Sequence, residues 1–143
     1  MSFPERFDLV DKMVLICPSK SEENSEVDGG ANFLRENEAW GYVRVARDPV
    51  YFALYEGVPT KAIRYFGIID RIISPIDTLS PFRDETHSQD MAKEGKKLIL
   101  LKKGTLNKLG HPITLGPSGV GIMGPQFVKL SAFLDAHTLD DLR

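Results

Sequence analysis

The sequence has a single cysteine, no long apolar run and little excess charge. Cys17 cannot form an internal disulfide, so the fold does not depend on one. No stretch approaches the roughly 18 consecutive apolar residues that a membrane-spanning helix needs. The first residues, Met1 to Arg6, lack the basic and then apolar pattern of a secretory signal. We therefore expect a cytoplasmic protein without a membrane span.

The sequence also lacks the residue patterns of two common kinds of site, for zinc and for a dinucleotide. His87, His111 and His137 have no cysteine or histidine neighbour at the spacing of zinc ligands. The glycine loop at 116–124 contains the letters G-x-G-x-x-G of a dinucleotide site, but only 19 residues follow it, too few for the helix, second strand and acidic residue that such a site requires. We therefore expect no metal and no cofactor, and we interpret the loop as a flexible segment that lines a pocket or acts as a lid.

The composition is that of one folded domain, which we expect to span residues 1–143. Hydrophobic residues make up 42% and charged residues 27% of the chain, as in ordinary globular domains. The net charge of −2 excludes binding of polyanions by bulk charge, so any nucleic-acid site must be local. Between Lys93 and Lys108, six lysines accompany one acidic residue, Glu94. The residues that we expect to form a basic patch are Lys96, Lys97, Lys102 and Lys103. Lysines that protect an exposed strand edge would give the same pattern.

Hydrophobic patterning predicts a sheet with few helices. Strands are predicted at 12–17, 40–46, 51–55, 62–73, 97–102 and 111–115. Short helices are predicted at 31–38, near 89–94, and in the C-terminal segment where Phe127, Leu130, Leu134 and Thr138 have helical spacing. The 62–73 strand is the longest, which favours a central position, and Gly67 within it predicts a bulge or bend. The fold class is therefore α+β, with a small curled mixed sheet or pseudo-barrel and a few short helices.

Aromatic and arginine residues on the predicted strands form the most informative pattern. Trp40, Tyr42 and Arg44 alternate onto one face of their strand, and Tyr55 and Arg64 come from strands expected to lie nearby. Together they would form a cleft in which bases stack on rings and arginine contacts phosphate or base edges. In the competing interpretation the rings fill a core and the arginines are solvated. The sequence leaves both interpretations open.

Three stretches resemble the PUA-like group, which includes the EVE and ASCH domains. They are Trp40-Gly-Tyr-Val-Arg44, the strand at 62–73 with its Phe66-Gly67-Ile68 centre, and Lys96-Lys-Leu-Ile-Leu-Leu101. The resemblance covers about residues 40–103. It implies a curled sheet or pseudo-barrel that binds RNA or a modified nucleobase, with Trp40 and Arg44 near the binding cleft and Phe66 and Gly67 in the barrel wall.

Three functions follow as hypotheses. The first is binding of RNA, single-stranded nucleic acid or a modified nucleobase through the aromatic and arginine cleft. The second is a small hydrolase or ribonuclease like some ASCH proteins, for which Lys61 or Asp70 is the nominated base. The third is a non-catalytic protein-interaction domain that docks a basic partner on the acidic segment at 22–28.

Overall fold

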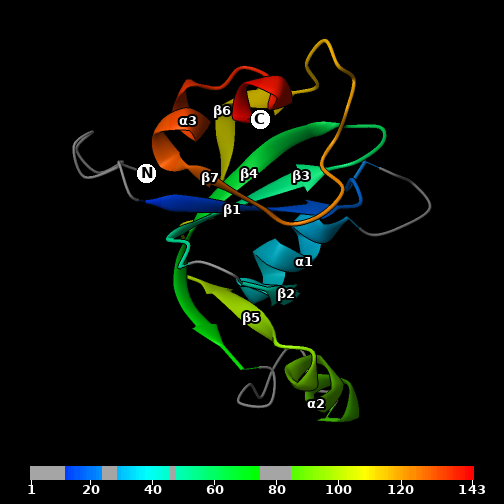
Figure 1. The fold of residues 1–143 in the computed structure, drawn as a ribbon, viewed down its shortest axis with the longest axis vertical. Coiled ribbons are helices and arrows are strands. Elements are labelled where there is room, and N and C mark those ends of the chain that lie inside the picture. The colour runs from blue at the N-terminus through cyan, green and yellow to red at the C-terminus, as the bar shows by residue number, and fades with distance from the viewer. Residues whose placement is uncertain (1–11, 24–28, 46–47, 75–84) are drawn as a thin grey trace.

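A computed structural model describes residues 12–23, 29–45, 48–74 and 85–143. The strands are β1 (Met13–Ser19), β2 (Ala39–Arg44), β3 (Tyr51–Glu56), β4 (Ala62–Ile73), β5 (Lys96–Leu101), β6 (Asn107–Thr114) and β7 (Gln126–Lys129). The helices are α1 (Gly30–Asn37), α2 (Glu85–Lys93) and α3 (Leu130–Asp135), followed by the short 3₁₀ helix η3 (Leu139–Leu142). The described strands form one mixed sheet in the order β2-β5-β4-β3-β1-β7, with β6 paired to β4 (Figure 1). The predicted α+β class with a curled mixed sheet is confirmed.

β4 is the centre of this sheet, as its length predicted. It pairs with β3 along one edge, and along the other edge it pairs first with β6 and then with β5. Gly67 lies where the partner changes, and a Cβ there would come within 3.3 Å of Leu101 Cδ1. The register shifts flank Gly67 and fall at Arg64 and Asp70, so Gly67 itself remains paired with Phe52. Figure 1 shows how strongly this long strand curls.

β1 and β3 are parallel, which makes the sheet mixed. Parallel neighbours need a long connection, and here it contains α1 and β2. On its other side β1 pairs with the antiparallel strand β7. We predicted a helix around Phe127 from its spacing, and this was wrong: Phe127 belongs to β7, and the helix begins at Leu130. The four residues of β7 are too few for the alternation of a strand to be recognised in the sequence.

Two hydrophobic cores lie on opposite faces of the central strands. In β1 and β3 successive residues alternate between them, so both strands read as continuous apolar runs. One core packs under α3, η3 and the loop at 115–125; Phe66, Phe133 and Leu139 belong to it. The other packs under α1 and contains Phe52 and Leu34. Figure 1 shows α3 and α1 on opposite sides of β1 and β3, with α2 beside β5 at the far end. Within the described ranges, no helix is long and apolar enough to cross a membrane.

Candidate functional site

The residues of the predicted cleft lie in separate parts of the molecule. Trp40 is half-buried beside the α1 core, with its ring centroid 5.8 Å from that of Phe52. Tyr55 is buried in the opposite core, where a Cβ at Gly121 would come within 2.5 Å of its hydroxyl oxygen. The sheet therefore separates these two rings, because their strands alternate between the two cores. The side chain of Tyr42 lies outside the described part of the chain.

Arg44 lies beside part of the predicted basic patch. β2 is antiparallel to β5, and their register places Arg44 opposite Lys96 and Val43 opposite Lys97. The Arg44 Nε donates to the carbonyl oxygen of Glu94 at 3.2 Å, and the Glu94 carboxylate pairs with Lys96 at 3.3 Å. A register shift between Trp40 and Tyr42 interrupts the alternation on which a common face depended. Arg44 is thus grouped with lysines, and Trp40 with the α1 core.

Arg64 is the extra residue of a bulge in β4. The pairing of β4 with β3 and with β6 skips from Ile63 to Tyr65, so Arg64 has no cross-strand partner. Bulges redirect side chains, and Arg64 approaches Tyr65, with its Cζ 5.7 Å from that ring centroid. From there it binds the carboxylate of Glu56 with two bonds, Nε to Oε1 at 2.6 Å and Nη2 to Oε2 at 2.9 Å. Glu56 is fully buried and extends the alternation of β3 onto the α1 side.

A network of five residues surrounds this ion pair, and we call it the Glu56 network: Glu22, Arg35, Glu56, Arg64 and Tyr65. The Glu22 amide donates to Glu56 Oε2 at 3.1 Å, and the Tyr65 hydroxyl donates to Glu22 Oε1 at 2.6 Å. The Glu22 carboxylate also accepts a bond from Arg35 at 2.7 Å. Burial and the bond to Glu22 raise the pKa of Tyr65 to about 12. Despite its burial, the bonds from Tyr65 and Arg35 hold the pKa of Glu22 below its ordinary value.

The Glu56 network fixes the segment after β1 onto the sheet. Every group in it has a partner, and next to it Ser21 is fully buried with its hydroxyl 2.5 Å from that of Thr60. Of the acidic segment predicted as a docking surface, Glu22 and Glu23 both pair with Arg64, and residues 24–28 lie outside the described ranges. Sequence reasoning missed Glu56. The available signal was a charged residue that directly follows the apolar strand at 51–55.

The lysines of β5, β6 and the turn between them form a second feature, which we call the lysine row: Lys96, Lys97, Lys102, Lys103 and Lys108. The sequence from 95 to 134 contains six lysines and no acidic residue. Lys96 is half-buried and the other four are exposed. Among the residues that the structure describes, only Lys96 of this row pairs with a carboxylate. Because β6 and β5 pair with the same edge of β4 one after the other, the lysines follow one another along that edge.

The residues proposed as catalytic bases, Lys61 and Asp70, do not form a site together. Lys61 is exposed in the turn between β3 and β4, where it has a positive φ of 50°. Asp70 is exposed on β4 with Arg71 as its ion-pair partner at 3.5 Å. Cys17 is buried in β1, and burial raises its pKa to about 12. In the described ranges no group of three or more His, Cys, Asp or Glu side chains is placed to hold a metal ion.

Comparisons with known proteins concern the fold. No family model matches the chain, and no curated protein matches it. Among solved structures, the crystal structure of ASCH from Zymomonas mobilis is 14% identical and aligns over 82% of this chain and 89% of its own, with a TM-score of 0.49. A serine-to-alanine mutant of ASCH from the same organism is 16% identical over 82% and 87%, with a TM-score of 0.49. Both matching structures are of ASCH proteins, the kind of domain named in the sequence resemblance.

Proposed function

We propose that this protein binds RNA or another single-stranded nucleic acid along the lysine row. The observation that carries the proposal is the concentration of five lysines, four of them exposed, in a stretch from 95 to 134 that contains no acidic residue, on an otherwise acidic protein. Outside the stretch from 95 to 134, the chain has 12 Lys and Arg against 20 Asp and Glu. A local surface of this kind attracts a phosphate backbone although the net charge is negative.

Protection of a strand edge explains only part of the row. β5 lies between β2 and β4, so Lys97 does not border an open edge. Lys102 and Lys103 belong to the turn after β5, which is held on β4 by the bond from the Lys102 amide to the Ile68 carbonyl at 2.8 Å. Of these lysines, Lys108 is the one that lies on an edge strand: the only ladder described for its strand, β6, is with β4. Phosphate contact accounts for the whole row, and Arg44 extends it beyond Lys96.

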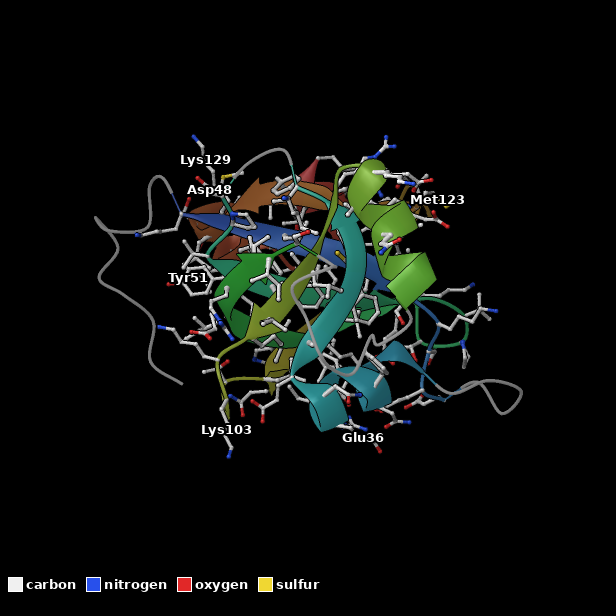
Figure 2. The ribbon with its side chains drawn as sticks, turned by 90° about the horizontal axis from the view of Figure 1, so that it is seen from below. Glu36, Asp48, Tyr51, Lys103, Met123 and Lys129 are labelled. Carbon is white, nitrogen blue, oxygen red and sulfur yellow. The ribbon has the colours of Figure 1, made fainter. Side chains whose placement is uncertain are left out.

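The test measures binding of a fluorescently labelled single-stranded RNA by anisotropy over a series of salt concentrations. The variant is the double substitution Lys102→Gln and Lys103→Gln. Each lost phosphate contact lowers the slope of log affinity against log salt by about 0.7, so the double variant loses about 1.4 and binds roughly tenfold more weakly at physiological salt. Lys129→Gln is the matched control, since Lys129 is also exposed and lies on the opposite side of the molecule from Lys103 in Figure 2.

The outcomes separate the alternatives. Loss of affinity in the lysine-row variant with a normal Lys129→Gln variant supports the proposal. A loss in Lys129→Gln that is about half of the loss in the double variant on a logarithmic scale, as its single charge would give, indicates attraction by general charge and contradicts a localised site. If the wild-type protein does not bind RNA or single-stranded DNA at low salt, the proposal is wrong. The same titrations with Trp40→Phe and Arg44→Gln test the ligand contacts predicted for these residues, which stay predictions, as do those of Tyr42, Tyr55 and Arg64.

A further inference from the structure

The carboxylates of Glu22 and Glu23 lie among donors that bind anions. The guanidinium of Arg35 on α1 donates to the Glu22 carboxylate at 2.7 Å, and that of Arg64 on β4 lies 3.3 Å from it. The Tyr65 hydroxyl donates to the same carboxylate at 2.6 Å. Arg64 also donates to the Glu23 carboxylate at 3.0 Å. Arginine binds carboxylate and phosphate oxygens with similar geometry, so these donors suit a phosphate as well.

Lys108 connects these donors with the lysine row. Its Nζ lies 5.8 Å from the centroid of the Tyr65 ring, which belongs to the core under α1. The Cζ of Arg35 is 5.3 Å from the same centroid. Lys108 is exposed and the side chain of Arg35 is 44% exposed, so both cations are open to a ligand. A phosphate chain that follows the row to Lys108 therefore reaches Arg35 on the same face of the sheet.

The burial of the carboxylates shows which of them can be exchanged. Glu56 is fully buried and binds Arg64 with two bonds, so it stays in place. The side chains of Glu22 and Glu23 are nearer the surface, with exposed fractions of 15% and 57%. If these two turn away, the three cations around the Tyr65 ring face one described carboxylate, that of Glu56. The excess of two positive charges then matches two neighbouring phosphates of a strand.

This exchange requires movement of side chains only. The Glu22 amide donates to Glu56 Oε2 at 3.1 Å. Ser21, the residue before it, is fully buried with its hydroxyl 2.5 Å from that of Thr60. These contacts do not involve the Glu22 carboxylate, so they hold the main chain in place whichever anion binds the arginines.

We propose that the three cations around the Tyr65 ring form a phosphate subsite at the end of the lysine row, which Glu22 and Glu23 occupy in the free protein. The inference rests on the proposed function and adds to it a contact site and a competitor within the chain. Because the two carboxylates are attached to the same chain, their effective concentration at the subsite is high. A single phosphate ion therefore displaces them poorly, whereas a strand already held by the row displaces them well.

The experiment measures binding of the labelled single-stranded RNA to the double variant Glu22→Gln and Glu23→Gln. Glutamine keeps the size of each side chain but does not compete as an anion. We expect the affinity at physiological salt to rise about tenfold and the slope against log salt to steepen by about 1.4, the effect of two phosphate contacts. In a protein that also carries Arg35→Gln, the gain should fall to about threefold, because one of the two contacts is absent.

The matched control is the double variant Glu36→Gln and Asp48→Asn. It also removes two exposed carboxylates, and neither belongs to the Glu56 network (Figure 2). A misfolded protein loses affinity, so a gain cannot result from misfolding. Glu23→Gln alone, at an exposed position, provides a second variant that keeps the fold, with an expected gain of about threefold.

The possible results separate the two proposals. A gain that exceeds that of the control and shrinks with Arg35→Gln supports the subsite. A gain equal to that of the control, or one that Arg35→Gln leaves unchanged, indicates general charge, overturns the subsite and leaves the lysine row intact. Unchanged affinity in both the double variant and Glu23→Gln also overturns it. If neither the wild-type protein nor the double variant binds RNA, the proposed function is refuted, and the subsite with it.

Discussion

Replacement of Glu56 by glutamine tests whether the Glu56 network stabilises the fold. Glu56 is fully buried and accepts three hydrogen bonds, two from Arg64 and one from the Glu22 amide. The substitution keeps the size of the side chain and removes its charge. The new amide nitrogen is a donor at a position where the carboxylate oxygen accepted a hydrogen bond. It faces another N–H group there, so at least one hydrogen bond is lost. Arg64 is left with less compensation in a site that is only 16% exposed.

The expected loss follows from these contacts. Removal of one partner of a buried ion pair costs about 3–5 kcal/mol, because the remaining charge is left without compensation. Arg64 keeps Glu22 at 3.3 Å and Glu23 at 3.0 Å, which places the loss at the lower end. We therefore expect Glu56→Gln to lower the free energy of unfolding by about 3 kcal/mol. For a chain of this length that corresponds to a decrease in Tm of roughly 10 °C.

Urea unfolding followed by circular dichroism measures this difference. Asp70→Asn is the control, since the Asp70–Arg71 pair is 3.5 Å apart and mostly exposed. Exposed pairs contribute little, so the control is expected to change stability by less than about 0.5 kcal/mol. The reasoning is refuted if Glu56→Gln stays within about 1 kcal/mol of wild type, the range of an exposed pair, with an unchanged dependence on urea.

Two further predictions concern titration. Because burial and the bond to Glu22 raise the pKa of Tyr65 to about 12, an ultraviolet absorbance titration should show a tyrosine that ionises late, and Tyr65→Phe should remove the phase with the highest midpoint. The raised pKa means that this stabilisation is complete below the ordinary tyrosine pKa of 10 and is lost as the pH rises from 10 to 12, so a stability that is constant over this interval contradicts the prediction. Burial raises the pKa of Cys17 to about 12, against a smaller opposing effect of its hydrogen bond with Trp40. A thiol reagent at mildly alkaline pH should therefore modify Cys17 only in denaturant, and rapid labelling of the native protein would show that β1 is accessible.

The strands could be predicted because their residues are of the types that form buried strands. The 62–73 strand is observed at Ala62–Ile73, and the strand at 51–55 extends by one residue to Glu56. These segments combine β-branched and aromatic residues with clear breaks at their ends, so local pattern and final burial agree. Helix α1 was likewise expected close to its observed position.

The site was harder to predict because it depends on register. A strict alternation would have placed Arg64 on the face opposite Tyr65, and only the bulge brings the two together. The shift between Trp40 and Tyr42 has the same effect on β2. Such shifts result from pairing between distant segments, which a single sequence does not report. The lysine row could be predicted without knowledge of the strand register, since its lysines lie close together along the chain.

The pairing of β1 with β7 has a consequence for how this chain folds. Ile16 and Gln126 are register partners although 110 positions separate them, and β1 also needs β3 on its other side. Closing a loop of that size costs entropy before any contact offsets it. Sheets built on such distant pairings fold in milliseconds to seconds, whereas bundles of local helices fold far faster. During synthesis β1 therefore cannot complete its pairing until the last quarter of the chain has been made. Until then, the edge of β1 that β7 later covers is open to other strands.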